Sequence, residues 1–282
     1  KKRCTMKKII VPIDFSEHSE YALKTAAKFA KRFEAEVLAL HMLEMSDTML
    51  TASDGLQYEK ARFFIQLSEQ KFESFLKKDY LNDIKVTPII KPFKVFSEIA
   101  EVAKTHNADL IIMGSHGTSG FKEFFVGSNT ERVVRTAEVP VLIVKSENIN
   151  INFETVVFAC DFTNDAIKPY KEVLNLFDKK DTNLYFVYVN LPNERFKSSV
   201  EIEQRVANFF NEADGNLDHM SKVQYVSDYT VENGVLNFSL KVGADIIAIP
   251  TRGKTGIAHF FEGSIGEDIA NHANLPVITF KI

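Results

Sequence analysis

An internal repeat constrains the fold of this chain more than any other feature of its sequence. The run DLIIMGSHGTSGFKEFFVGSNTERVVRTAEVPVLIVK, which begins at Asp109, aligns without gaps with DIIAIPTRGKTGIAHFFEGSIGEDIANHANLPVITFK, which begins at Asp245. Nearer the start of each half, KIIVPIDFS (Lys8–Ser16) resembles ETVVFACDFT (Glu154–Thr163). A period of about half the chain predicts a duplicated domain rather than a solenoid of short repeats.

The length of the chain agrees with two copies. At 282 residues it has room for about two domains of ordinary size. We place the boundary in the polar stretch Lys145–Asn150, which gives one domain at residues 1–147 and a second at residues 148–282.

Within each half, short β-branched runs alternate with segments whose apolar residues recur at helical spacing. In the first half we expect strands at Lys8–Ile13, Glu36–Leu43, Lys85–Lys91, Asp109–Met113 and Val139–Val144, and helices from near Ser16, over Gln57–Lys78, over Ser97–His106 and from Ser128. Residues 155–282 repeat this order. Ser46–Gly55 is the least patterned stretch and is expected to be a mobile loop.

This alternation predicts the fold class. Nearly continuous Val, Ile and Leu strands between helices are typical of parallel sheets that are covered by helices on both faces. The sequence therefore predicts an α/β fold with two tandem Rossmann-like domains.

Composition narrows the class of protein further. With 45% hydrophobic and 26% charged residues, the chain is typical of a globular protein with a substantial core. A net charge of −4 and a pI of about 6.0 argue against a nucleic-acid-binding surface. The apolar run IIVPI stops at Asp14, too soon for a signal peptide, and no stretch is long enough to span a membrane. Met6 is a candidate for the natural start, and we expect a cytoplasmic protein.

Metal and disulfide chemistry have little sequence support. Cys4 and Cys160 are the only cysteines, too few for a disulfide framework or a cysteine metal site. None of the 7 histidines falls into metal-ligand spacing. His116 is interpreted as a solvated loop residue, with phosphate contact or action as a base as the alternatives. His41 is interpreted as a core or rim histidine of an apolar strand.

A glycine-rich segment follows the fourth expected strand of the first half. MGSHGTSGFKEFFVGSNT, from Met113 to Thr130, holds four of the chain's 12 glycines. Glycine lets the backbone N–H groups approach an anion closely. Ser128, Asn129 and Thr130 suit a helix start, and a helix N-terminus attracts phosphate. Ligands of open parallel sheets bind where such strands end.

The spacing of the glycines distinguishes this segment from the two commonest phosphate motifs. Two residues separate Gly114 from Gly117, and nine more precede Gly127-Ser128. The spacing fits neither G-x-x-x-x-G-K-[ST] nor G-x-G-x-x-G. It is similar to the G-x2-G-x9-G-[ST] nucleotide motif of the universal stress protein family. Together with VPIDFS at the first strand and PVLIVK at the last, the resemblance covers both halves and identifies the chain as a tandem member of that family.

The resemblance implies a five-stranded parallel sheet in each domain, with strand order 3-2-1-4-5, and an adenine nucleotide as ligand. ATP is the expected nucleotide, with Mg²⁺ as an optional companion and ADP or AMP as alternatives. Asp14 would hold the ribose or adenine side, next to Pro12 and Ile13, and the backbone of Met42 would meet the adenine. The site residues implied by the glycine motif are Met113, Gly114, Ser115, His116, Gly117, Gly127, Ser128, Asn129 and Thr130.

The resemblance also implies pairing through the last strands. In a tandem chain this pairing can be internal, with Val139–Val144 against Pro276–Lys281 as a pseudo-dimer. A homodimer of the whole chain is a further expectation.

The second copy lacks several of these features. Pro250 stands in place of Gly114, and proline removes an N–H and adds bulk where the backbone should face the ligand. Ile265-Gly266 replaces Asn129-Thr130, whereas Gly263-Ser264 and Asp161 are kept. We therefore expect the first half to bind ATP and the second to bind it weakly or not at all.

Three functions remain open from the sequence. The first is a nucleotide-dependent stress-response or regulatory module. The second is a slow ATP hydrolase, which the sequence supports less because it offers no clear general base or arginine finger. The third is an interaction scaffold that binds no nucleotide. Asp14 also has a structural alternative, in which it caps the helix that begins at Ser16.

Overall fold

The computed structural model describes residues 6–43, 54–92, 98–115, 128–147, 149–177, 182–251 and 275–282. The described residues up to Ile151 form one compact unit, and those from Asn152 onward form a second. The expected boundary after residue 147 stays a prediction, although the residues that follow it, as far as Ile151, pack with the first unit.

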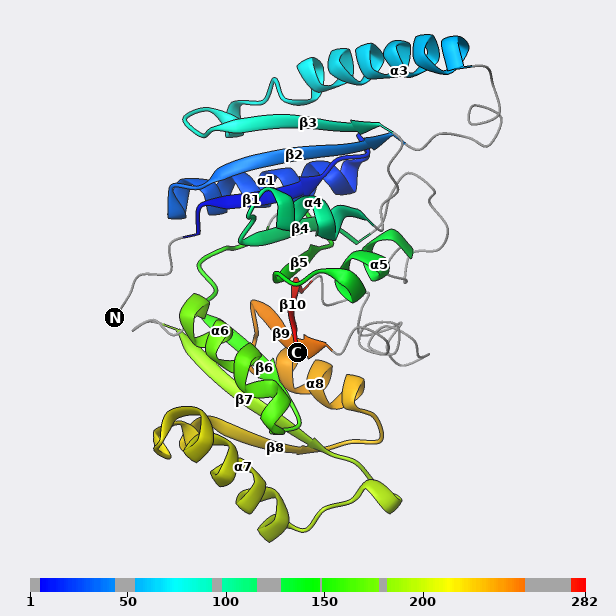
Figure 1. Cartoon of the computed structure of the whole chain (residues 1–282). Coiled ribbons are helices and arrows are strands. Elements are labelled where there is room, and N and C mark those ends of the chain that lie inside the picture. The colour runs from blue at the N-terminus through cyan, green and yellow to red at the C-terminus, as the bar shows by residue number, and fades with distance from the viewer. Residues whose placement is uncertain are drawn as a thin grey trace. The chain divides into compact units, whose positions relative to one another are not determined.

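The first unit is a parallel sheet with the strand order β3-β2-β1-β4-β5 (Figure 1). Its elements are β1 (Lys8–Pro12), α1 (Glu17–Phe33), β2 (Glu36–Leu43), α3 (Asp54–Phe75), the 3₁₀ turn η1 (Asp79–Leu81), β3 (Val86–Pro92), α4 (Ile99–Thr105), β4 (Leu110–Gly114), α5 (Ser128–Thr136) and β5 (Val141–Val144). In Figure 1, α1 lies behind the strands and α4 and α5 lie in front of them, so helices cover both faces.

The second unit repeats this topology. Its strand order, β8-β7-β6-β9-β10, corresponds to 3-2-1-4-5 of the first unit, and its strand pairs are parallel. Its elements are β6 (Thr155–Ala159), η3 (Asn164–Ala166), α6 (Ile167–Phe177), β7 (Asn183–Asn190), η4 (Asn193–Arg195), α7 (Ser199–Asp214), η5 (Asp218–Lys222), β8 (Val223–Ser227), α8 (Val231–Lys241), β9 (Ile246–Thr251) and β10 (Val277–Lys281). The predicted fold class is confirmed.

The apolar runs of the sequence become the central strands because helices on both faces exclude water from them. All five residues of β4 are buried, as are four of the five in β1. Helix α1 buries its alanine-rich stripe, including Ala22, Ala26 and Ala30, on this sheet. Small side chains let the helix backbone approach the strands closely, and this approach shapes the candidate site.

One aspartate in each half ties the fourth strand to the first. Asp109 Oδ2 accepts hydrogen bonds from the backbone N–H groups of Lys7 and Lys8 at 2.7 and 3.0 Å. Asp245, its aligned partner, accepts one from the N–H of Thr155 at 2.8 Å. These aspartates lie at the amino ends of the strands, so their retention in both halves reflects a structural role.

The core of the second unit is unusually aromatic. Tyr170 of α6 is fully buried, and its ring lies 5.4–5.7 Å from the rings of Phe186, Phe209 and Phe210. Its hydroxyl forms hydrogen bonds with Asp214 Oδ2 and, at 2.6 Å, with His219 Nδ1. The core therefore contains one fully hydrogen-bonded phenol that ties α6 to the end of α7 and to η5.

The observed bounds differ from the expected ones mainly at helix ends. Helix α3 begins at Asp54, three residues before the expected Gln57. The prediction of a loop over Ser46–Gly55 was therefore wrong for Asp54 and Gly55, and the rest of that stretch lies outside the described residues. Short polar residues at a helix start resemble those of a turn, because both use the same local hydrogen bonds.

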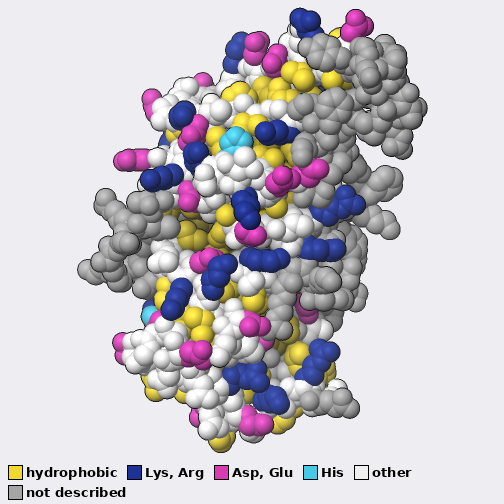
Figure 2. Space-filling model, in the orientation of Figure 1, with side chains coloured by type: hydrophobic (Ala, Val, Ile, Leu, Met, Phe, Trp, Pro, Cys, Tyr) yellow, Lys and Arg dark blue, Asp and Glu magenta, His cyan; other side chains and the backbone are white. Residues whose placement is uncertain are grey.

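Two further features are the mixture of side chains on the visible face and the limited apolar character of the helices. In Figure 2, Lys and Arg side chains are interspersed with Asp and Glu over the visible face, and hydrophobic side chains are visible near α3 at the top. Among the α3 side chains whose burial the structure describes, Phe63, Phe64 and Leu67 are exposed large apolar residues. Within the described ranges, no helix combines the length and the apolar character needed to cross a membrane.

Candidate functional site

The turn after β1 carries Asp14, the first candidate ligand-binding side chain. Asp14 Oδ1 accepts hydrogen bonds from the backbone N–H of Ser16 at 3.0 Å and from the Ser16 hydroxyl at 2.5 Å. Ser16 is the N-cap of α1, and its Oγ accepts a hydrogen bond from the N–H of Ser19 at 3.2 Å. Asp14 therefore supports the capping residue and does not itself cap the helix.

Phe15, between these two residues, adopts the left-handed backbone region with φ 65°. This conformation is uncommon for a bulky side chain. The ring contacts His41, Phe72 and Phe75 at centroid distances of 4.7, 5.2 and 5.5 Å. This aromatic packing offsets the backbone strain and fixes the turn that presents Asp14.

The second half builds the same turn. Asp161 Oδ1 accepts hydrogen bonds from the N–H and the hydroxyl of Thr163 at 3.2 and 2.8 Å. Phe162 has φ 52°, and its ring packs against Phe209 and Phe210. The Asp-Phe-Ser/Thr turn is thus common to both domains, so Asp14 has a structural role whether or not it binds a ligand.

His41 of β2 supports the same turn from the neighbouring strand. Its Nδ1 donates a hydrogen bond to the Ile13 carbonyl at 2.7 Å, which assigns the proton to Nδ1. Burial is the main cause that lowers the pKa of His41 below its ordinary value. The structure agrees with a core or rim histidine, but sequence reasoning missed that His41 orients a candidate site residue. The signal was its place near the end of the strand next to β1.

The other candidate ligand-binding residues on β1 and β2 can offer a ligand mainly their backbone atoms. Pro12 is the last residue of β1 and pairs in register with Leu40. The N–H of Ile13 donates to the Leu40 carbonyl at 2.7 Å, and Ile13 is buried. Met42, two residues after Leu40 on β2, is also buried. Only their backbone atoms suit a ligand.

At the end of β4, Gly114 is in close contact with α1. A Cβ atom at Gly114 would lie 2.7 Å from the carbonyl oxygen of His18 and 2.7 Å from its Cβ. Real Cβ atoms essentially never come so close to backbone atoms. Glycine is therefore required here by helix packing, independently of any ligand.

Thr130 joins the two ends of the glycine-rich segment. The Thr130 side chain is buried, and its hydroxyl donates a hydrogen bond to the Gly114 carbonyl at 3.0 Å. This bond connects the first turn of α5 to the end of β4. The expected contact of Thr130 with a ligand stays a prediction, and the bond to Gly114 gives this residue a structural role as well.

The remaining candidates divide into those that the structure places and those outside its range. Met113 and Ser115 are buried at the end of β4, and the N–H of Ser115 donates to the Val144 carbonyl at 3.0 Å. Asn129 is half-buried in the first turn of α5, which begins at Ser128. His116, Gly117 and Gly127 lie outside the described residues.

The second half differs at the positions aligned with the contact between Gly114 and His18. Pro250 occupies β9 where Gly114 occupies β4. The positions aligned with the start of α1 form the 3₁₀ turn η3, and α6 begins only at Ile167. Its Cys160 replaces Ile13, and burial raises the pKa of this thiol. The carboxyl edges of the two sheets thus share the Asp-Phe-Ser/Thr turn. They differ in how the fourth strand of each sheet meets the first helix of its unit.

Gly114→Ala is expected to lower the free energy of unfolding of the first unit by about 1–3 kcal/mol, because the new Cβ meets backbone atoms that cannot rotate away. Urea denaturation followed by far-UV circular dichroism measures this change. Pro250→Ala is the matched control, since that position already holds a side chain, and it should cost less than about 1 kcal/mol. Equal stabilities of wild type and Gly114→Ala would contradict the packing argument.

The described residues bring four segments together at one edge of the first sheet: the Asp14 turn, the first turn of α1, the end of β4 and the start of α5. Within the described ranges, no three His, Cys, Asp or Glu side chains form a group that could hold a metal ion. This edge combines a carboxylate, backbone groups and a helix N-terminus, an arrangement that suits a polar ligand with an anionic part.

Fold and site together define a tandem protein built from two parallel α/β domains of the 3-2-1-4-5 type. The sequence model of the universal stress protein family matches residues 5–145 and, a second time, residues 152–281. The chain belongs to the universal stress protein family.

Individual relatives agree with this assignment. A universal stress protein of Methanocaldococcus jannaschii is 35% identical over 158 residues, covering 50% of this chain and 96% of the relative. A second protein of that organism with the same description is 32% identical over 139 residues, covering 49% of this chain and 82% of the relative. Each relative thus corresponds to about one half of the chain.

A solved structure extends the likeness to both halves. The crystal structure of a universal stress protein from Archaeoglobus fulgidus covers 97% of this chain and 96% of its own, with a TM-score of 0.63 and 23% identity. At this identity the likeness concerns the fold.

Proposed function

We propose that this protein is a nucleotide-dependent stress-response module whose first domain binds ATP at the carboxyl edge of β1, β2 and β4. The observation that carries the proposal is the bond between Thr130 and Gly114, which closes the base of the loop with the G-x2-G-x9-G-S spacing. A loop whose ends are fixed loses less conformational entropy when it folds around a phosphate group.

The residues around this loop suit the parts of a nucleotide. Free N–H groups in the first turn of α5 would attract the phosphates. A carboxylate has about four acceptor sites, so Asp14 can support Ser16 and also accept a ribose hydroxyl. The backbone near Met42 would meet the adenine edge. Any Mg²⁺ would be carried mainly by the phosphates, as is usual for this ion.

The second domain supports the proposal as an internal comparison. It keeps the Asp161 turn but has Pro250 for Gly114 and Gly266 for Thr130, so it cannot form the same side-chain bond. We therefore expect one ATP per chain, bound by the first domain.

Isothermal titration calorimetry of the full chain with ATP tests stoichiometry and affinity. We expect one equivalent, with Thr130→Val weakening binding by roughly tenfold or more, because it leaves the buried Gly114 carbonyl without its partner. Thr130→Ser keeps the hydroxyl and should bind within about threefold of wild type. Thermal melts of both variants without ligand show whether a loss of binding reflects a loss of folding.

The outcomes separate the alternatives. Two equivalents of equal affinity would contradict the asymmetry, and absence of heat and thermal shift at millimolar ATP would favour the interaction scaffold. Phosphate release by wild type that disappears in Thr130→Val and returns in Thr130→Ser would favour the slow ATP hydrolase.

A further inference from the structure

The two units differ at one edge of their sheets. Among the described strands, β3 pairs only with β2 and β8 pairs only with β7, so each is the outermost strand of its unit (Figure 1). An outermost strand presents backbone N–H and C=O groups with which another strand can pair, and proteins usually protect such an edge with proline or charge. Since β3 and β8 are equivalent strands of the two copies, their edges can be compared residue by residue.

Two prolines block the edge of β3. The Lys85 carbonyl, directly before the strand, accepts the N–H of Val37 at 2.9 Å, so the backbone groups of Lys85 point toward β2. Because this direction reverses at each residue of a strand, the backbone groups of Pro88 and Pro92 point away from β2. Proline has no N–H, so both positions lack a donor on the open side of the sheet.

The backbone of β8 alternates in the same way. The N–H of Asp228, directly after the strand, donates to the Asn190 carbonyl of β7 at 3.4 Å. The backbone groups of Asp228 therefore point toward β7. Since the direction reverses at each residue, those of Val223, Tyr225 and Ser227 point to the open side.

The open side of β8 carries no proline. Pro88 pairs in register with the fourth residue of β2, and Val223 pairs with the fourth residue of β7. Pro92 and Ser227 correspond in the same way at the eighth residues. The segment Val223–Ser227 contains no charged residue either. The second unit thus has the same edge strand without the groups that usually protect one.

The sequence around β8 is complementary to itself. If two β8 strands run antiparallel about a two-fold axis at Tyr225, each Tyr225 lies opposite its own copy and Val223 lies opposite Ser227 of the second copy. All open-side residues then meet open-side residues, as antiparallel hydrogen bonding requires. In the same register Lys222 lies opposite Asp228 of the second copy, so opposite charges meet at both ends of the paired segment.

The hydrogen bonds of this pairing can be assigned. Tyr225 would exchange N–H···O=C bonds with Tyr225 of the second copy, and the N–H of Ser227 would donate to the opposite Val223 carbonyl. The N–H of Val223 already donates to the Met220 carbonyl, so it is not needed. The Tyr225 side chain is 47% exposed and Ser227 is exposed, which agrees with an accessible edge.

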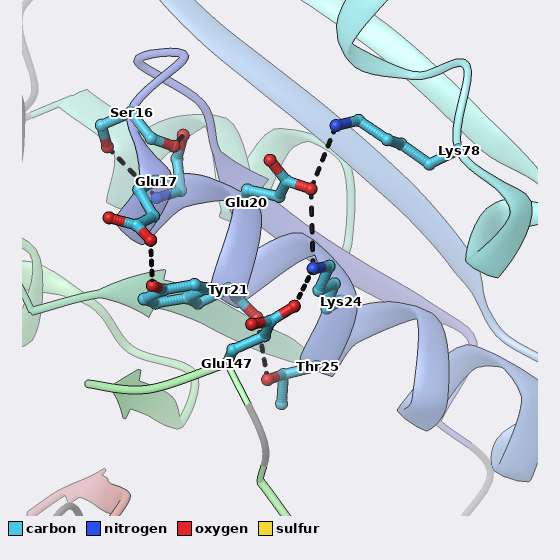
Figure 3. A network of polar contacts seen from close by, with 9 residues as sticks. Ser16, Glu17, Glu20, Tyr21, Lys24, Thr25, Lys78 and Glu147 are labelled. Atoms are coloured by element: carbon cyan, nitrogen blue, oxygen red, sulfur yellow. Dashed lines mark hydrogen bonds and ion pairs between the residues drawn. The ribbon is translucent and has the colours of Figure 1, made fainter.

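Charged side chains on the first unit offer a partner less than this edge does. Lys24 of α1 forms an ion pair with Glu147. Glu20, one turn earlier, forms another with Lys78 at 3.1 Å (Figure 3). These charges are neutralised within the unit, whereas the backbone groups of an open edge gain new hydrogen bonds when a strand is added.

We propose that the edge of β8 is an interface for a second copy of this chain, formed by antiparallel pairing of the two β8 strands about Tyr225. The interface joins the second units of two chains and needs no nucleotide. A two-fold interface uses the same surface on both copies, so assembly through this edge stops at two chains. The prolines of β3 disfavour the equivalent pairing of the first unit.

Sedimentation velocity of the full chain without nucleotide, over about 1 to 100 µM, tests the proposal. We expect a reversible dimer of the wild type. Ser227→Pro copies the proline of β3 and removes the N–H that donates to Val223, so it should weaken dimerisation by roughly tenfold or more. Ser227→Thr, the matched control, keeps this N–H and should dimerise within about threefold of the wild type.

A disulfide tests the register. Directly opposed Cα atoms of a hydrogen-bonded antiparallel pair lie about 5.5 Å apart, within the range of a disulfide. Tyr225→Cys should therefore form a covalent dimer when treated with oxidised glutathione. Gln224→Cys is the control, because Gln224 lies opposite Val226 and not opposite its own copy. It should give no more covalent dimer than the wild type, which already contains Cys4 and Cys160.

The outcomes are distinct. A wild type that stays monomeric up to about 100 µM would overturn the proposal and favour an extended peptide of another protein as the strand added to this edge. A dimer that Ser227→Pro does not weaken would also overturn it, because the interface would lie elsewhere. If thermal melts show that Ser227→Pro is unfolded, the comparison of Tyr225→Cys with Gln224→Cys decides, and equal cross-linking of the two contradicts the register.

Discussion

Tyr170→Ala is expected to lower the free energy of unfolding of the second unit by about 3–5 kcal/mol, the range typical of buried aromatic residues replaced by alanine. The ring is fully buried and contacts Phe186, Phe209 and Phe210, so its removal leaves a cavity that rigid neighbours cannot fill. It also removes the hydroxyl that joins α6 to Asp214 and His219.

Tyr170→Phe separates these two contributions, because it keeps the ring and deletes only the hydroxyl. The side chains of Asp214 and His219 are 20% and 21% exposed, so water can replace the lost partner. We expect a loss of about 1 kcal/mol for this variant.

Urea denaturation monitored by far-UV circular dichroism measures both effects in the full chain, which contains no tryptophan. Tyr229→Ala is the control, since this side chain is 85% exposed, and it should change stability by less than about 0.5 kcal/mol. A loss for Tyr170→Phe as large as that for Tyr170→Ala would show that the hydroxyl network, and not ring packing, dominates.

Lys145→Met is expected to stabilise the first unit by about 1 kcal/mol at pH 7. Lys145 follows β5, and burial lowers the pKa of its ammonium group from 10.5 to about 8. A difference of this size sets an upper limit of roughly 3 kcal/mol on the free energy that disfavours the charged form in the folded protein. Because Lys145 is only half-buried, solvent screening makes the net cost smaller. Methionine keeps the apolar stem and removes the charge.

The same pKa determines how this gain depends on pH. Below about pH 8 the lysine is charged in both states, and the folded state carries the full cost of burying the charge. Between about 8 and 10.5 the unfolded state binds more protons than the folded state, so wild-type stability rises with pH. The advantage of Lys145→Met should therefore shrink between pH 7 and pH 10.

Denaturation midpoints at pH 7 and pH 10, for wild type and Lys145→Met, measure this dependence. Lys104→Met is the control, since its side chain is 74% exposed, and it should change stability by less than about 0.5 kcal/mol at both pH values. A gain that does not change with pH would mean that Lys145 is charged in the folded state throughout.

The fold could be predicted from the sequence because its determinants are local and duplicated. The apolar run Glu36–Leu43 was expected as a strand and forms β2 with these bounds. Strand order came from the family resemblance, because a strand's apolar pattern does not specify its neighbour. The start of α3 at Asp54 was missed, since the turn-forming residues before it mask the onset of the helix.

The candidate site was predictable only as a set of positions. The Asp14 turn and the start of α5 at Ser128 lie where the sequence placed them. The contact of Gly114 with His18 and the bond from His41 to Ile13 were not foreseen. Both join segments far apart in the sequence, and each depends on interatomic distances that a one-dimensional pattern does not encode.

The turn shared by Asp14-Phe15-Ser16 and Asp161-Phe162-Thr163 has a consequence for tracing ancestry in tandem proteins. Because each aspartate stabilises its own domain, selection for folding alone can preserve it after a copy has lost its ligand. An aspartate at this position therefore indicates common ancestry of the two domains and does not by itself indicate ligand binding. Residues without such a structural role are better indicators of whether each domain still binds a ligand.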